Sequence, residues 1–349
     1  MKILLTTANT GKVFQELAAQ LDGGMSLLIL MHDNPDPDAL ASAFALKQIC
    51  EGLYHSNVII TYGGLLTRAE NRTMVRLLGI PVYKIDTVDM SRYDRIALID
   101  TQPGRGNNSL PTDARCNLVF DHHPVHAASK ADVIINNTGV GATATLLTEL
   151  YIAGGLTLKA NLATALAYAI RTETQELNRE ASDRDIKAYL AVYPRSSLRK
   201  LGKISFPKLR RSYFNTLSYA LKHARVYRNV IVAHLDFVET PELIAEVADM
   251  LLRYERMSWA LVTGFYKNSL YLSLRTAQQK IHAHRIILKL VDNKRFAGGH
   301  ETFAGGRIAV KEGGDNNLHK LVERTWTRFT SALGYTEPEW KNLLDEEIY

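Results

Sequence analysis

The chain has 349 residues, of which 46% are hydrophobic and 22% charged, the balance of an ordinary globular protein. One hydrophobic core would be unusually large at this length, so two domains are expected. Two cysteines, Cys50 and Cys116, exclude a disulfide framework, and the formal net charge of +6 favours an anionic partner. No apolar stretch is long enough for a secretory signal or a membrane helix, so a cytoplasmic protein without membrane contact is expected.

Up to about residue 190, strand-like apolar runs alternate with helical stretches. The predicted helices cover residues 39–53, 68–78, 142–153 and 160–170. Because strands that alternate with helices form parallel sheets, this part of the chain is predicted to be an α/β domain with a parallel sheet.

Three predicted strands, at residues 26–31, 95–99 and 117–120, lead into carboxylates and imidazoles. These side chains are His32, Asp36 and Asp38 after the first strand, Asp100 after the second, and Asp121, His122 and His123 after the third. Parallel strands bring their carboxyl ends to one edge of the sheet, where open α/β proteins bind ligands. So many acids at one edge are costly unless a cation neutralises them. The pattern therefore predicts a metal site with two ions.

The ligand types indicate which metals and which chemistry would suit the site. Oxygen and imidazole ligands without thiolate favour manganese, magnesium, zinc or cobalt. Asp100 comes from a middle strand and could bridge two ions, while Asp121 is placed to orient a neighbouring imidazole. Two ions about 3.5–4 Å apart would activate water for an in-line displacement at phosphorus. Each motif alone is more often a turn or a helix cap, so the prediction depends on their combination.

The motifs together resemble the DHH phosphoesterases, a family named after the triplet that stands here at residues 121–123. Residues 32–42 resemble the family's first motif, and residues 98–101 resemble the second. At the fourth motif Glu173 replaces the usual Asp and Ala169 the usual Gly. Glu173 keeps a carboxylate on a longer arm, so the resemblance still implies a metal ligand there.

A second resemblance lies far downstream. Residues 296–306 are similar to the signature of the DHHA1 domain, which accompanies the DHH domain, and residues 271–275 resemble its arginine-bearing strand. The substrate-binding residues that this resemblance implies, across a cleft between the two domains, are Arg275, Gly298, Gly299 and His300. Adjacent glycines let a backbone approach an anionic ligand closely, and an arginine can bind a phosphate bidentately.

The resemblance also assigns roles at the predicted metal site. The implied ligands of one ion are His32, Asp36 and Asp100. The implied ligands of the other ion are Asp38, Asp100, His122 and Glu173. His123 and Asp121 are implied as the catalytic residues, with His123 facing the scissile phosphate. The two cations are expected to be Mn²⁺, with Mg²⁺ or Co²⁺ as alternatives.

The composition changes between residues 194 and 228, where ten Lys or Arg and no Asp or Glu occur. The aromatic residues in this stretch could stack on bases, or they could pack on the catalytic domain; both interpretations are open. Further on, strands are predicted at residues 229–235, 259–266 and 269–275. Helices are predicted at 240–253, capped by Thr240, and at 317–333.

These patterns predict four regions. They are a catalytic metal-binding DHH domain over 1–190, a basic linker over 191–228, a smaller α/β DHHA1 domain over 229–315 and a helical tail over 316–349. The active site is expected in the cleft between the two domains.

The resemblance implies a phosphodiesterase or phosphatase of the oligoribonuclease/pAp phosphatase branch, with short RNA oligonucleotides or small nucleotides such as pAp as substrates. A cyclic dinucleotide phosphodiesterase and a pyrophosphatase or exopolyphosphatase are alternatives with the same chemistry. A nucleotide-binding protein that has lost catalysis is a third alternative, suggested by Glu173 and Ala169. The sequence leaves the cleavage polarity and the oligomeric state open, with a homodimer among the candidates.

Overall fold

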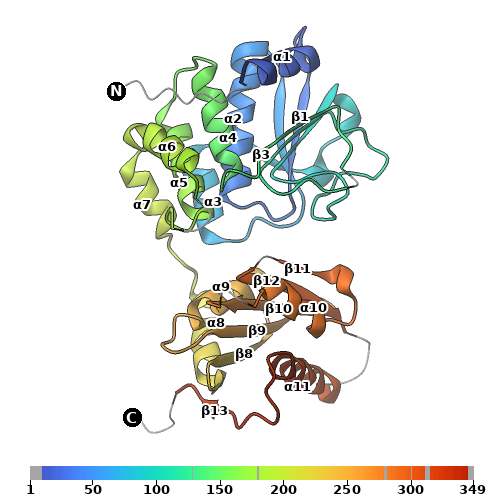
Figure 1. The fold of residues 1–349 in the computed structure, drawn as a ribbon, viewed down its shortest axis with the longest axis vertical. Coiled ribbons are helices and arrows are strands. Elements are labelled where there is room, and N and C mark those ends of the chain that lie inside the picture. The colour runs from blue at the N-terminus through green and yellow to red at the C-terminus, as the bar shows by residue number, and fades with distance from the viewer. Residues whose placement is uncertain are drawn as a thin grey trace. The chain divides into compact units, whose positions relative to one another are not determined.

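The computed structural model describes residues 10–127, 129–178, 181–278, 281–299, 301–310 and 315–344. The chain divides into two compact units, Met1–Lys208 and Leu209–Tyr349 (Figure 1). Each unit has its own sheet and its own hydrophobic core, and each is described by itself. No described helix is both long enough and apolar enough to span a membrane.

The first unit is built on a six-stranded sheet. Its strands are β1 (Leu27–Met31), β2 (Val58–Tyr62), β3 (Val82–Lys84), β4 (Arg95–Ile99), β5 (Leu118–Asp121) and β6 (Val133–Asn136). They lie in the order β3-β2-β1-β4-β5-β6 and every pair is parallel, which confirms the predicted α/β class. The order reverses between β1 and β4. In open α/β sheets, ligands bind at such a switch point, outside the carboxyl ends of the strands.

Helices cover one face of this sheet. They are α1 (Thr10–Leu21), α2 (Pro37–Tyr54), α3 (Ala69–Leu78), α4 (Thr143–Ala153), α5 (Ala160–Glu173), α6 (Asp183–Val192) and α7 (Leu198–Ser205). Leu27, Ile29 and Met31 of β1 point into the helical core, whereas Leu28 and Leu30 point to the opposite face. Short 3₁₀ turns, η1 (Ile85–Thr87) and η2 (Met90–Arg92), contribute to that opposite cluster. The four predicted helices of this unit are present with ends shifted by a few residues.

The basic stretch is folded on both sides of the division between the units. The 3₁₀ turn η3 (Tyr193–Arg195) and α7 precede the division, and α8 (Arg211–His223) and β7 (Arg225–Tyr227) follow it. Helix α7 buries Leu201 and Ile204, and α8 buries Ala220. Much of the region predicted as a linker therefore has regular structure, because its apolar residues recur at helical spacing.

The second unit has a seven-stranded sheet in the order β11-β12-β10-β9-β8-β7-β13. The remaining strands are β8 (Val230–Phe237), β9 (Trp259–Tyr266), β10 (Ser269–Thr276), β11 (Ala297–Gly299), β12 (Phe303–Ala309) and β13 (Lys341–Asn342). The β8–β9 pair is parallel and the other pairs are antiparallel. The predicted strands 229–235, 259–266 and 269–275 are all present.

Helices pack on both faces of the second sheet. Besides α8 they are α9 (Glu242–Leu251), α10 (Ala283–Leu290) and α11 (Asp315–Ala332), with a 3₁₀ turn η4 (Lys294–Phe296). Residues of α8 and α9 share a core with one face, and residues of α10 and α11 share a core with the other. The predicted cap at Thr240 is wrong, because Pro241 occupies the cap position and the α9 cap has no side-chain hydrogen bond.

Candidate metal centre

The predicted metal ligands gather at the carboxyl ends of β1, β4 and β5, beside the switch point. His32 follows β1, Asp36 caps the start of α2, and Asp100 follows β4. Asp121 is the last residue of β5, so His122 and His123 emerge at the same edge. The parallel register of the three strands therefore brings together residues that are ninety positions apart in the sequence.

Asp100 occupies the middle of this cluster. Its side chain is only 4% exposed and its backbone is left-handed, with φ +57°. One carboxylate oxygen lies 3.6 Å from Nε2 of His32. The other lies 3.6 Å from Nε2 of His122 and 3.7 Å from Nδ1 of His123. One carboxylate thus faces both halves of the cluster, as its predicted bridging role requires.

The described residues form two overlapping groups of potential ligands, each with its ligand atoms within 4.8 Å of one another. One group is His32, Asp36 and Asp100, and the other is Asp100, His122 and His123. These five residues are called the DHH centre below. The first group is the set that the sequence predicts for one ion. The second contains His123, which the sequence places at the phosphate.

Asp121, which the sequence predicts to orient an imidazole, is in contact with His123. Its Oδ1 lies 2.8 Å from Nδ1 of His123 and also accepts the backbone N–H of that residue at 3.1 Å. Its Oδ2 accepts a 2.6 Å hydrogen bond from the side-chain amide of Gln102. Burial lowers the pKa of His123, but the carboxylates of Asp121 and Asp100 outweigh burial and raise that pKa to about 9.

Asp38 and Glu173 lie outside the two groups but near them. Both oxygens of Asp38 accept backbone hydrogen bonds at 2.7 Å, from Thr143 and Ala144 at the start of α4. Glu173 is the last residue of α5. Burial, together with the negative charges of the neighbouring aspartates, raises the pKa of both carboxyls well above the usual range. Their predicted roles as ligands stay predictions.

The chemistry of this cluster fits divalent cations. Nε2 of His122 is buried and has no hydrogen-bond partner among the described residues, although a carboxylate oxygen lies 3.6 Å away. Burial lowers the pKa of His32, but Asp36 and Asp100 raise it to about 10. Carboxylates that crowd in this way, beside an imidazole nitrogen with no partner, are the expected surroundings of a bound cation.

Three residues that support the centre have no signal in the sequence. The hydroxyl of Thr143 donates to Asp100 at 2.9 Å, and Gln102 holds Asp121. Asp185, the third, is fully buried. It accepts hydrogen bonds from the backbone of Gly141 at 2.9 Å and the hydroxyl of Thr145 at 2.6 Å. Asp185 therefore fixes the start of α4, whose N–H groups bind Asp38.

A close backbone approach holds the loop that carries His32. Asn34 donates its N–H to the carbonyl of Gly63 at 3.1 Å. A Cβ at Gly63 would lie 1.9 Å from Oδ1 of Asp33 and 2.1 Å from the hydroxyl of Ser109. A side chain at residue 63 would therefore displace the Asp33 carboxylate and the Ser109 hydroxyl, which donates to that carboxylate at 2.7 Å.

Gly63→Ala is therefore expected to destabilise the first unit by about 1–3 kcal/mol, since the added methyl must displace the Asp33 carboxylate and break its hydrogen bond with Ser109. Urea denaturation in the presence of a chelator measures this effect. Gly202→Ala in α7 is the matched control, because its Cβ meets nothing within 4 Å and the change should be neutral or slightly stabilising. Equal stability of the two variants would show that Gly63 is not tightly packed against the loop that carries Asp33.

The predicted substrate-binding residues belong to the second unit. Arg275 on β10 is paired with Asp249 and donates a 2.9 Å hydrogen bond to the hydroxyl of Ser273. Gly298 and Gly299 lie on β11 beside β12. A Cβ at Gly299 would lie 2.4 Å from the backbone of Ala304, whereas one at Gly298 would meet nothing within 4 Å. His300 lies outside the described residues.

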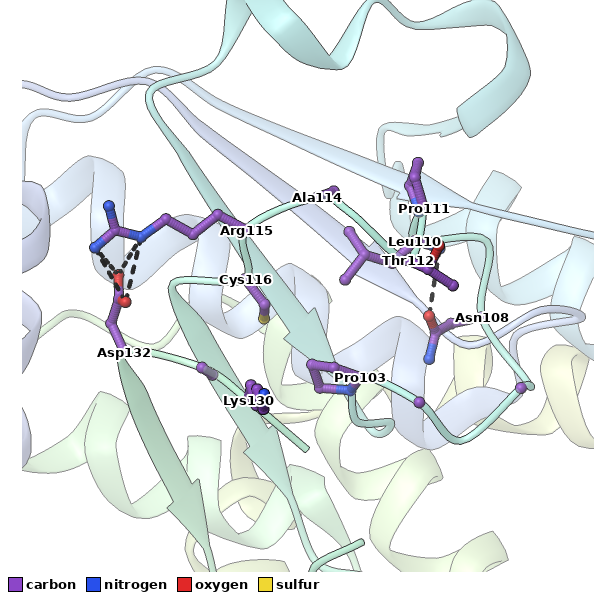
Figure 2. Close-up of a pocket in the computed structure, with 13 residues that line it drawn as sticks. Pro103, Asn108, Leu110, Pro111, Thr112, Ala114, Arg115, Cys116, Lys130 and Asp132 are labelled. Atoms are coloured by element: carbon purple, nitrogen blue, oxygen red, sulfur yellow. Dashed lines mark hydrogen bonds and ion pairs between the residues drawn. The ribbon is translucent and has the colours of Figure 1, made fainter. Parts of the chain in front are cut away.

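A cavity of about 780 Å³ in the first unit is lined by the loop between β4 and β5 and by the residues just before β6. Figure 2 shows Cys116 and the Arg115–Asp132 ion pair, which precede β5 and β6, together with Pro103 and Asn108. No residue of the DHH centre lines this cavity. Its size alone therefore does not make it the active site.

The fold and the centre define an α/β protein with a carboxylate–histidine cluster at a sheet switch point. Residues 26–170 match the family model described as DHH family, N-terminal domain. An uncharacterised protein of Methanocaldococcus jannaschii is 33% identical over 323 residues, covering 90% of this chain and 65% of that protein. A probable manganese-dependent inorganic pyrophosphatase of Shouchella clausii is 26% identical over 148 residues, covering 42% of this chain and 47% of that protein. The chain thus spans between about half and two thirds of these relatives.

Solved structures share the fold at low sequence identity. An exopolyphosphatase-related protein from Bacteroides fragilis aligns with a TM-score of 0.72 and 14% identity, over 96% of this chain and 100% of that one. RecJ from Thermus thermophilus in complex with Mn²⁺ aligns with a TM-score of 0.55 and 14% identity, over 96% and 56% of the two chains. These likenesses confirm the fold class.

Proposed function

We propose that the protein is a metal-dependent phosphoesterase that uses two divalent cations, with Mn²⁺ the preferred metal. The single observation that supports this most directly is the position of Asp100, whose two oxygens face His32 on one side and His122 and His123 on the other. The DHH domain match supports the same chemistry, as does the similarity to a probable manganese-dependent pyrophosphatase. Cations at this centre would activate water and neutralise charge on the phosphate.

We assign each residue around the cations a role in binding metal or substrate. His32, Asp36 and Asp100 would hold one ion, and Asp38, Asp100, His122 and Glu173 the other. His123 would contact the scissile phosphate, with its ring fixed by Asp121. Because His123 is held by a buried carboxylate, its imidazole carries a positive charge more readily, which suits contact with a phosphate oxygen.

For the substrate, we propose short oligoribonucleotides or small nucleotides such as pAp. The support lies in the second unit, where Gly298 leaves open space beside the backbone and the guanidinium of Arg275, now paired with Asp249, would exchange that carboxylate for a phosphate. Both features suit an anionic ligand with a nucleoside attached. Inorganic pyrophosphate is the second candidate, because a probable manganese-dependent inorganic pyrophosphatase is 26% identical over 148 residues.

The test is hydrolysis of a dinucleotide RNA, pAp, a cyclic dinucleotide and pyrophosphate, each with Mn²⁺ and with chelator. We expect turnover of the dinucleotide or pAp with Mn²⁺ and none after chelation. Turnover of pyrophosphate alone would support the second candidate, and turnover of the cyclic dinucleotide alone would assign the protein to that class.

Two further outcomes would contradict the proposal that the protein is a metal-dependent enzyme. Hydrolysis that survives chelation would exclude a metal-dependent mechanism. Binding of nucleotide without any turnover would make the protein a nucleotide binder whose catalysis has lapsed. In that case Glu173, whose side chain is longer than the usual Asp, would be the first residue to change. Hydrolysis restored by Glu173→Asp would show that this longer side chain caused the loss.

A further inference from the structure

A second cluster of potential metal ligands lies in the second unit. It lines a cavity of about 660 Å³ between β8, α8, α11 and the chain around β13. The cluster comprises His234 and Asp236 on β8 and His319 and Glu323 on α11. No predicted role of the DHH centre or of the substrate-binding glycines involves these residues.

His234 lines the cavity, and one of its ring nitrogens is held by a side-chain hydroxyl. Its Nδ1 lies 3.0 Å from the hydroxyl of Thr263, and that hydroxyl donates to the carbonyl of Ala233. In the tautomer in which Nδ1 donates to the hydroxyl of Thr263, Nε2 carries the lone pair. Nε2 is buried and has no hydrogen-bond partner among the described residues. An imidazole whose other nitrogen is fixed by a hydrogen bond is the usual form of a metal-ligating histidine.

Asp236 supplies an oxygen at the spacing a cation needs. Its Oδ1 lies 3.4 Å from Nε2 of His234, and its Oδ2 accepts a hydrogen bond from the hydroxyl of Tyr219. Two ligands at about 2.1 Å from a tetrahedral ion lie about 3.4 Å apart. The pair therefore already has the separation of two ligands on one ion.

The backbone of β8 is irregular where this pair lies. Its register with β9 shifts between His234 and Phe237, and Asp236 has φ +48°. A regular strand would point residues 234 and 236 to the same face about 7 Å apart. Bulges of this kind re-aim side chains and occur beside functional sites. The irregularity thus brings the two ligand atoms together.

Helix α11 can complete the coordination. His319 and Glu323 are four residues apart, so they lie on one face of the helix, and both line the cavity. His319 is exposed and lies near enough to His234 to interact with it electrostatically. Within the described part of the chain, three ligand atoms lie within 4.8 Å of one another only at the DHH centre. A third ligand in this cavity therefore requires a rotamer change of His319.

The cluster repeats the local signature of the DHH centre. There, too, a buried Nε2 without a hydrogen-bond partner, that of His122, lies 3.6 Å from an aspartate oxygen. We propose that the second-unit cavity binds a Zn²⁺-class divalent cation through His234, Asp236 and His319, with Glu323 or water as the fourth ligand. Two imidazoles and a carboxylate form a ligand set that suits zinc.

The first experiment measures the zinc content of the full-length chain after saturation with Zn²⁺ and desalting. Wild-type protein is expected to retain one more zinc per chain than His234→Ala or Asp236→Asn. His284→Ala on α10 is the matched control, since His284 does not line the cavity, and it should retain the wild-type content. Two variants that remove a ligand are used because one of them could fail to fold. Circular dichroism would reveal such a defect, and the other variant would then decide the zinc content.

A second readout does not depend on counting ions. All three tryptophans lie in the second unit, and two of them, Trp326 and Trp340, line the cavity. Co²⁺ added to Mn²⁺-saturated protein should therefore quench tryptophan emission in wild type and His284→Ala but not in His234→Ala. Equal zinc content and equal quenching in folded wild-type and His234→Ala protein would overturn the proposal.

Discussion

Asp100→Asn is expected to abolish metal-dependent hydrolysis while leaving the fold intact. The amide keeps one oxygen for the hydroxyl of Thr143, which donates to Asp100 at 2.9 Å. Asparagine also tolerates the left-handed backbone at φ +57° better than most residues. It loses the charge that faces both His32 and His122, so neither ion keeps its shared ligand. A fall in kcat of at least about 1000-fold is expected, since the cations supply several kcal/mol of charge stabilisation.

Two measurements distinguish loss of catalysis from loss of structure. Calorimetric titration with Mn²⁺ should show that Asp100→Asn no longer binds two ions, and circular dichroism should match wild type. Asp113→Asn, which alters an exposed aspartate in the loop between β4 and β5, is the control and should retain activity. Wild-type activity in folded Asp100→Asn would refute the bridging role.

Much of the first unit follows from local sequence patterns. The strands before His32, Asp100 and Asp121 are continuous apolar runs, because parallel strands are buried on both faces. Their carboxyl ends must share one edge, so the sequence could predict that these acids and histidines meet. The resemblance to the DHH family added the roles; the match over residues 26–170 supports the resemblance, and the roles themselves stay predictions.

Other features depend on contacts that no local pattern reveals. Asp38 binds the start of α4, which lies 105 residues further along the chain. Gln102 supports Asp121 only because the loop after β4 turns back beside β5. In the sequence, His234 and Asp236 look like two residues of an ordinary strand. In the structure, a register shift in β8 brings their ligand atoms together. In each case tertiary structure, rather than residue spacing, decides which groups meet.

A buried ion pair between α4 and α6 is expected to contribute both to the stability of the first unit and to the position of the backbone beside the DHH centre. Glu149 on α4 is only 3% exposed, and both its oxygens accept from Arg184 on α6, at 2.8 and 2.5 Å. The residue after Arg184 is Asp185, which holds Gly141 and Thr145 at the start of α4. Loosening α6 should therefore also loosen the N–H groups that bind Asp38.

Arg184→Met is expected to lower the free energy of unfolding of the first unit by about 2–3 kcal/mol. A buried carboxylate without its partner costs about 3–5 kcal/mol, and the partial exposure of Arg184, 31%, reduces that cost. Urea denaturation with chelator present measures the change without a contribution from bound metal. Arg92→Met, which breaks the exposed pair with Asp89, is the control and should cost less than about 1 kcal/mol.

The double variant Arg184→Met/Glu149→Leu identifies the physical cause. If the cost of Arg184→Met comes from the unpaired charge, replacing Glu149 with an apolar residue should recover most of the lost stability, because the buried charge is gone. If the cost comes from the geometry of the Arg184 contact, the double variant should be no more stable than the single one. Recovery of stability together with wild-type Mn²⁺ affinity would show that Asp185 alone is sufficient to position the start of α4. Recovery of stability with weakened Mn²⁺ binding would show that the ion pair also sets the position of α6, and through it the backbone that binds Asp38.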